Sequence, residues 1–227
     1  MNKFLNNLKE QPFITEGLIA LNVIYFIFLT LVGGTLNPLI LAKYGALVPN
    51  LVVNGQWYRL ITAMFIHIGF EHIILNMVCL YFLGRILEQV IGHVRYLIIY
   101  FFAGIMANIL TLFTATPNTI SAGASGAIFG IIGVWLMLAE QYRNQQYLVQ
   151  MGRQMLLFSI LGLLSGMFST DINIWAHFGG LVSGFLSAYV IGFPKIGPVQ
   201  KQKRWGSLLL LVCIMITFLN LAFTLYK

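Results

Sequence analysis

Charged residues are scarce in this sequence of 227 residues, because only 8% are Asp, Glu, Lys or Arg while 59% are hydrophobic. A soluble domain carries about 25% charged and about 45–50% apolar residues, so a soluble fold of this size is excluded. The high hydropathy excludes disorder, and two cysteines are too few for a disulfide scaffold. The few cations are dispersed between apolar runs, which argues against nucleic-acid binding. The composition therefore predicts an all-α polytopic membrane protein.

Seven hydrophobic runs approach the roughly 20 residues that a helix needs to cross a bilayer. They cover about residues 17–36, 72–91, 94–114, 123–140, 154–169, 173–193 and 206–226. Residues 1–16 are predicted to be a short polar or interfacial lead-in, and 194–205 a basic linker before the seventh span at 206–227. The long stretch 37–71 is either an interfacial loop or a partly embedded structured loop, and its composition leaves both interpretations open.

The distribution of Lys and Arg predicts the orientation in the cell membrane. Numbering the span ends alternately places the following cations on one side: Lys3, Lys9, Arg85, Arg95, Arg143, Arg153, Lys195, Lys201, Lys203 and Arg204. Only Lys43, Arg59 and Lys227 fall on the other side. The N-terminus and the basic linker are therefore expected in the cytoplasm, and the C-terminus and segment 37–71 outside.

Three polar residues of the even-numbered spans are predicted to lie at similar depth. Ser125 and His177 each lie 18 residues before a basic residue at the inner end of their span, which corresponds to roughly 27 Å along a helix. His72 lies 13 residues before Arg85, or roughly 20 Å. All three are therefore expected below the outer membrane surface, within reach of water.

Glycine spacing indicates which helix faces meet. One stripe on the fourth span contains Gly123, Gly126, Gly130 and Gly133, and a second on the sixth span contains His177, Gly180 and Gly184. Faces of small residues let two helix backbones approach closely in lipid. This contact would place Ser125 next to His177, with Phe129, one turn after Ser125, packed against the imidazole.

His72 and Asn76 are four residues apart, so both project from one face of the second span. Neutral donors at this depth suit the stabilisation of a developing oxyanion. A metal site is not favoured, because a spacing of five puts His67 and His72 on different helix faces and few acids are near. Each polar residue alone has a structural explanation, such as a serine that bonds back to its own helix. Their combination at one depth favours a catalytic site.

Several motifs in this order resemble the rhomboid intramembrane serine proteases, from about Leu18 to Phe193. The resemblance rests on GxSG at Gly123–Gly126, AHxxGxxxG at Ala176–Gly184, HxxxN at His72–Asn76, the earlier His67, the aromatic-arginine motif Trp57-Tyr58-Arg59, and Glu88 at the inner end of the second span. It implies a rhomboid-like bundle of six helices, over 17–193, plus one C-terminal transmembrane helix. Many relatives carry Tyr where Phe129 stands.

The resemblance also implies the chemistry. Ser125 would be the nucleophile and His177 the general base, with the Ser125 N–H, His72 and Asn76 holding the oxyanion. Substrates would be single-span membrane proteins in the lipid bilayer, cut near the outer end of the span, with no metal or organic cofactor. The alternatives are a catalytically inactive rhomboid-like binding or quality-control protein, which usually lacks the Ser or the His, and a small transporter, which needs charges at mid-membrane. The oligomeric state stays open.

Overall fold

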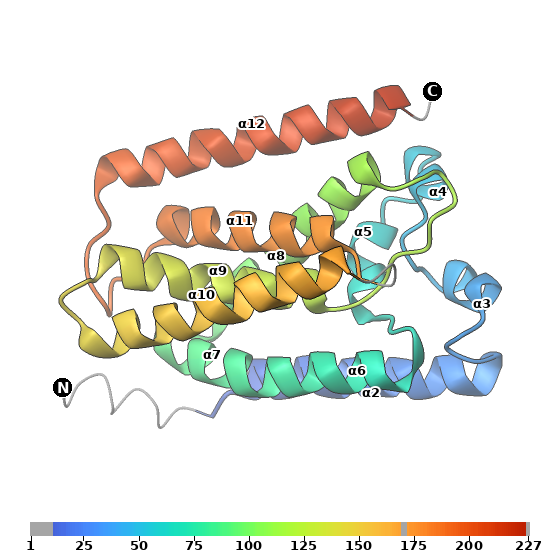
Figure 1. The fold of residues 1–227 in the computed structure, drawn as a ribbon, viewed down its shortest axis with the longest axis horizontal. Coiled ribbons are helices and arrows are strands. Elements are labelled where there is room, and N and C mark those ends of the chain that lie inside the picture. Colours follow the sequence, from blue (N-terminus) through green and yellow to red (C-terminus); the bar gives the residue numbers. More distant parts are fainter. Residues whose placement is uncertain (1–10, 169–171, 226–227) are drawn as a thin grey trace.

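Helices account for the architecture of this chain in a computed structural model that describes residues 11–168 and 172–225 (Figure 1). The long helices are α2 (Phe13–Val32), α6 (Gly69–Cys79), α8 (His93–Thr114), α9 (Ser125–Gln141), α10 (Gln146–Met167), α11 (Ile174–Ile191) and α12 (Lys201–Leu225). Helix α6 continues through the π-helical η2 (Leu80–Gly84) into α7 (Arg85–Ile91). Each of the seven hydrophobic runs is thus helical over most of its described residues, and the all-α prediction is confirmed.

The lengths and apolar composition of these helices fit a bilayer. Within the described ranges, 6 helices are long and apolar enough to cross a membrane, with α6 to α7 counted as one span. Helix α9 is shorter, with 17 residues, and is apolar along its length. The chain is therefore a multi-pass membrane protein.

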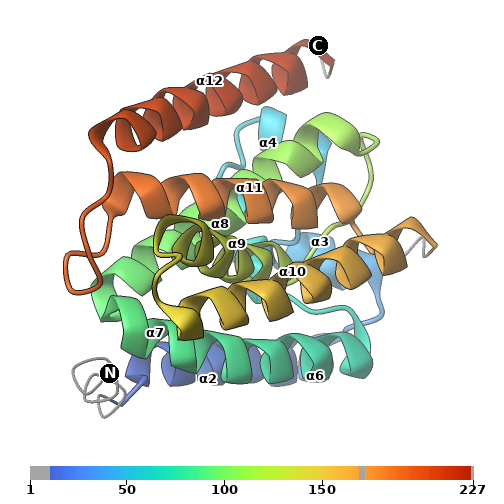
Figure 2. The same cartoon turned by 60° about the vertical axis from the view of Figure 1, so that its left-hand side comes forward.

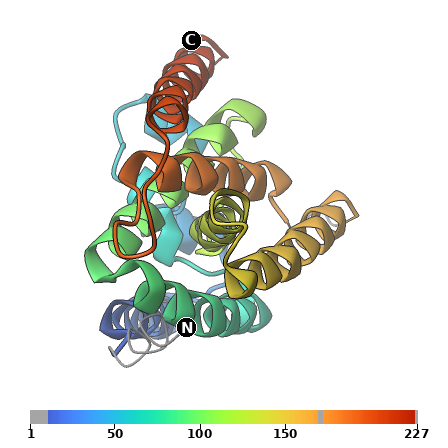
Figure 3. The same ribbon diagram turned by 90° about the vertical axis from the view of Figure 1, so that its left-hand side faces the viewer.

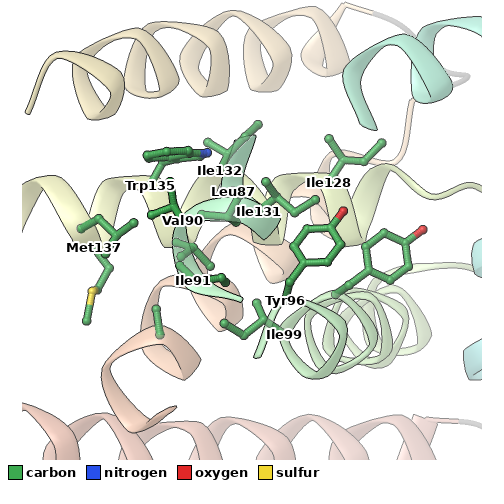
Figure 4. Packing of buried hydrophobic residues seen from close by; sticks show 14 of the residues in the cluster. Leu87, Val90, Ile91, Tyr96, Ile99, Ile128, Ile131, Ile132, Trp135 and Met137 are labelled. Atoms are coloured by element: carbon green, nitrogen blue, oxygen red, sulfur yellow. The ribbon is translucent and has the colours of Figure 1, made fainter. Parts of the chain in front are cut away.

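Helix α9 runs through the middle of the bundle, as the view along the bundle shows (Figure 3). Its side chains are buried from Gly126 to Trp135. Figure 4 shows part of the core around it, where Trp135 and Ile132 of α9 lie among residues of α7 and α8. A central helix that is surrounded by protein does not need to match the thickness of the bilayer, which explains why α9 can be short.

Some helices extend beyond the hydrophobic runs that predicted them. Helix α10 begins at Gln146 and not near 154, and α12 begins at Lys201 and not at 206, so part of the basic linker is helical. Backbone hydrogen bonding continues into water, so polar residues such as Gln150 and Arg153 extend a helix that hydropathy alone ends earlier. The first helix begins at Phe13, and residues 1–10 of the predicted lead-in lie outside the described residues.

The stretch between α2 and α6 is a structured loop. Its composition alone had left open whether it is structured. It contains the short helices α3 (Pro38–Lys43), α4 (Pro49–Val53), α5 (Arg59–Thr62) and η1 (Ala63–Phe65). The guanidinium of Arg59 is buried and donates to the carbonyl oxygens of Ala42 and Ala46, each at 2.7 Å. A buried cation needs such partners, so Arg59 holds the turn between α3 and α4 in place.

Glu88 joins the first helix to the bundle at the end remote from Ser125. Its carboxylate is fully buried and accepts from the N–H of Ile14 at 3.0 Å and of Thr15 at 2.7 Å. The Thr15 hydroxyl donates to it at 2.6 Å, and His93 Nδ1 lies 2.5 Å from its other oxygen. A carboxylate at a helix N-terminus satisfies unpaired N–H groups and interacts favourably with the helix dipole.

Helix α12 lies along α11 and α8 on the side of the bundle opposite α2 and α6 (Figures 1 and 2). Near its C-terminus Phe223 packs against Trp57 of the structured loop, with ring centroids 5.1 Å apart. Near its N-terminus Lys203 pairs with Glu140 of α9 at 2.9 Å, and Tyr189 of α11 donates to the same carboxylate. The seventh helix therefore contacts the core at both ends.

Candidate active site

The residues just before Ser125 are fixed by the structured loop. The Gly123 N–H donates to the Ala63 carbonyl at 2.9 Å, and the Ala124 N–H donates to His67 Nε2 at 3.3 Å. Gly123 has a φ of +132°, which a residue with a side chain rarely adopts. Gly123 therefore belongs to a turn ahead of the helix, and its predicted place in the helical glycine stripe is wrong.

Ser125 is the first residue of α9, and its side chain is partly exposed. The first N–H groups of an α-helix have no acceptor within the helix, so the Ser125 N–H is available to a ligand. The helix dipole adds a partial positive charge at this end. A hydroxyl and an anion-stabilising N–H therefore belong to one residue.

The backbones of α9 and α11 touch, as the glycine spacing predicts. A methyl group at Gly180 would overlap the carbonyl group of Gly126, and one at Gly184 would overlap that of Gly130. These two helices form the most extensive contact of any pair in the bundle. Ser125 precedes Gly126 by one residue and His177 precedes Gly180 by three, so both belong to the end of this contact nearest the structured loop.

His177 is buried and its ring stacks on Phe129, with centroids 4.2 Å apart and an interplanar angle of 10°. The predicted packing of Phe129 against the imidazole is therefore confirmed. His177 Nδ1 is buried and has no hydrogen-bond partner among the residues that the structure describes. Stacking on Phe129 therefore helps to orient the ring.

His72 borders the same space as Ser125. A Cβ atom added to Gly123 would lie 2.8 Å from His72 Nε2 and 3.8 Å from Ser125 Oγ. His72 Nδ1 accepts from the Ile68 N–H at 3.3 Å, which leaves the proton of the neutral ring on Nε2. Because Gly123 has no side chain, there is room here for a bound group that both the His72 Nε2–H and the Ser125 hydroxyl can contact.

Asn76 lies one turn after His72, and its Nδ2 donates to the His72 carbonyl oxygen at 2.9 Å. One amide hydrogen is therefore engaged within the helix, and the second is left for another acceptor. A nucleophile at a helix N-terminus, a buried imidazole and neutral donors are together the groups that acyl transfer requires.

Comparison with known proteins places the chain in a family. The family model named Rhomboid domain matches residues 54–193, which is more than half of the chain. This chain belongs to the rhomboid family. It is 36% identical to rhomboid protease GluP of Bacillus subtilis over 209 residues, which are 92% of this chain and 40% of GluP. It is 34% identical to putative rhomboid protease YdcA of the same organism over 153 residues, 67% of this chain and 73% of YdcA.

A plant relative gives a similar result. The chain is 36% identical to RHOMBOID-like protein 5 of Arabidopsis thaliana over 166 residues, which are 71% of this chain and 53% of that protein. The rhomboid chain thus spans well under two thirds of the length of GluP and of this plant relative. The part of the chain that matches the Rhomboid domain, residues 54–193, contains the helices that carry Ser125, His177 and His72.

His67 and His72 lie closer together in this rhomboid than their spacing predicts. Their ring centroids are 5.1 Å apart, because His67 precedes α6, which begins at Gly69 with a φ of +77°, so the two are not on one helix. Burial first, and then the nearby His72, lower the pKa of His67 to about 3. His67 therefore stays neutral at physiological pH and can accept from the Ala124 N–H. Arg59 and Glu88 lie away from this space and stabilise the loop and α2.

Asn173, which precedes α11, was not among the predicted site residues. Its Oδ1 accepts from the Ala176 N–H at 3.0 Å, and its Nδ2 donates to Thr111 Oγ1 at 2.9 Å. An Asn directly before an apolar run is a common signal for a helix start, and it could have identified this residue. Its contacts with α8 had no signal in the sequence.

Proposed function

We propose that this rhomboid is an intramembrane serine endopeptidase that cleaves transmembrane segments near the outer membrane face through a Ser125–His177 dyad. The observation that carries the proposal is the contact of α9 with α11, where Gly126 and Gly180 let the backbones touch. This contact brings together the helix that begins with Ser125 and the helix that carries His177.

The reaction is that of a serine protease with two catalytic side chains. His177 accepts the hydroxyl proton of Ser125 as Ser125 Oγ attacks the peptide carbonyl carbon. The oxyanion accepts from the Ser125 N–H, from His72 Nε2–H and from the second N–H of Asn76. His177 then gives its proton to the leaving amine, and a water molecule hydrolyses the acyl-enzyme by the same steps.

The substrates are single-span membrane proteins in the lipid bilayer. A peptide bond inside an intact helix is shielded, so the segment must unwind where it reaches Ser125. In the cell membrane the N-terminus is in the cytoplasm and the site opens to the outside, which follows from the excess of Lys and Arg at the other end of the spans.

Two relatives support the enzymatic class by name, since they are called rhomboid protease GluP and putative rhomboid protease YdcA. The alternative is an inactive rhomboid-like protein that binds membrane proteins. The chain has both Ser125 and His177, and the contact of Gly126 with Gly180 joins the two helices that carry them, which favours the enzyme.

The test is cleavage of a one-span substrate by purified protein in liposomes. Ser125→Ala and His177→Ala are each expected to abolish cleavage while the protein still inserts and accumulates, because each removes one member of the dyad. Lys201→Gln, an exposed change remote from the site, serves as the matched control and retains activity. Cleavage by Ser125→Ala at the wild-type rate rejects the proposal.

The oxyanion donors have a graded prediction. His72→Ala and Asn76→Ala are each expected to lower kcat by about 10²-fold or less, because the remaining donors still hold the charge. The measurement is kcat on the same substrate. Unchanged kcat in both variants contradicts the donor assignment without affecting the dyad.

A further inference from the structure

Asn173 uses both ends of its side-chain amide to connect separate parts of the chain. Its Oδ1 accepts from the Ala176 N–H at 3.0 Å, which makes it the N-cap of α11. Its Nδ2 donates to Thr111 Oγ1 of α8 at 2.9 Å and to Ser121 Oγ at 3.3 Å. Asn173 lies 62 residues after Thr111 and 52 residues after Ser121 in the sequence.

The hydroxyl of Thr111 determines how the amide is oriented. Thr111 is fully buried and donates its own proton to the Ala107 carbonyl at 3.0 Å. Its oxygen can therefore only accept from Asn173, which places the NH₂ group toward α8 and the oxygen toward the start of α11.

Ser121 extends this connection to the nucleophile. Its backbone pairs with that of Leu47 through two hydrogen bonds of 2.9 Å each, and it lies four residues before Ser125. Asn173 itself lies four residues, or about one helical turn, before His177. One side chain thus joins the first turn of the His177 helix to the segment that leads into Ser125.

We infer that Asn173 is a positioning residue for the Ser125–His177 pair. Its oxygen starts the His177 helix, and its NH₂ group fixes that start against α8 and Ser121. The inference depends on the proposed dyad chemistry, in which a small displacement between nucleophile and base is costly. A misplacement of about 1 Å lowers a rate by as much as 10²-fold.

Three variants separate the cap from the connection. Asn173→Ser keeps an N-cap hydroxyl but is too short to reach Thr111. The double variant Thr111→Val/Ser121→Ala removes both acceptors and leaves the cap intact. Thr114→Val is the matched control, because the Thr114 hydroxyl donates to the Leu110 carbonyl at 3.0 Å and has no contact with Asn173.

The measurements are kcat and KM on a one-span substrate, the rate of Ser125 labelling by a fluorophosphonate, and the melting temperature. Asn173→Ser and Thr111→Val/Ser121→Ala are each expected to lower kcat and the labelling rate about tenfold, with little change in KM. Combining all three changes is expected to cost no more than Asn173→Ser alone, because the same contacts are lost. Thr114→Val is expected to keep the wild-type kcat.

The inference is overturned if Asn173→Ser keeps kcat within about twofold of wild type, or if the two sets of changes lower kcat additively. It is also overturned if a lower melting temperature, and so a smaller folded fraction, accounts for the whole loss of kcat. Cleavage by Ser125→Ala at the wild-type rate instead rejects the proposed function. An inactive Ser125→Ala together with a fully active Asn173→Ser rejects this inference alone.

Discussion

At the scale of single residues, the ring of His177, the proposed base, packs flat on an aromatic side chain. His177 stacks on Phe129 at 4.2 Å, while its Nδ1 has no partner within the described part of the chain. In a Ser-His-Asp triad an acid holds that nitrogen and fixes the orientation of the imidazole. Here the flat contact with Phe129 must restrict the ring, so the aromatic face at position 129 matters more than its polarity.

Substitution of Phe129 tests this point. Phe129→Leu is expected to lower kcat about tenfold, because an aliphatic side chain gives the imidazole no flat surface. Phe129→Tyr is expected to keep more activity than Phe129→Leu, because it keeps the flat aromatic face against the imidazole. Steady-state cleavage of a one-span substrate measures both. Equal activity of Phe129→Leu and wild type contradicts the account.

The sequence predicted the contact of α9 with α11 and the packing of Phe129 against His177, because helical periodicity is a local property. The contact between His67 and His72 was not predicted, because it depends on the positive φ of Gly69, where the structured loop ends and α6 begins. The contacts of Asn173 join segments 62 residues apart, for which a single sequence gives no signal.

At the scale of helices, the contact of α9 with α11 is set by the absence of side chains. Gly180 faces the carbonyl group of Gly126, and Gly184 that of Gly130. Without water as a driving force, helices in a membrane associate through such close packing. Helix ends were predicted less well, because α10 and α12 continue through polar residues beyond the hydrophobic runs.

Gly180→Ala is therefore expected to push α11 away from α9, lower the melting temperature and reduce kcat by about 10²-fold. Gly17→Ala is the matched control, because no atom lies within 4 Å of the added methyl group and alanine favours the helix. Both are measured by thermal unfolding and substrate cleavage. A Gly180→Ala protein as stable and active as Gly17→Ala excludes the close contact.

At the scale of the whole molecule, polar side chains connect the outer helices to the bundle. Glu88 binds the N-terminus of α2, and Glu140 connects α9 with Lys203 of α12 and Tyr189 of α11. The sequence placed all seven helices in order but gave no sign of how α2 and α12 attach. These attachments depend on side chains far apart along the chain.

Glu88→Gln is expected to destabilise the protein by about 1–3 kcal/mol, because an NH₂ group would face N–H donors of α2. Glu16→Gln is the surface control, since its partner Arg85 is 3.4 Å away and both side chains are substantially exposed. Thermal unfolding in detergent measures the difference. Similar melting temperatures for the two variants contradict the assigned role of Glu88.

The most direct measurement of the central claim is the site of covalent labelling by a fluorophosphonate, identified by mass spectrometry of the labelled peptide. We expect a single adduct on Ser125 in wild-type protein and its loss in His177→Ala, because the hydroxyl reacts only when the imidazole accepts its proton. An adduct on another residue, or undiminished labelling of Ser125 without His177, contradicts it.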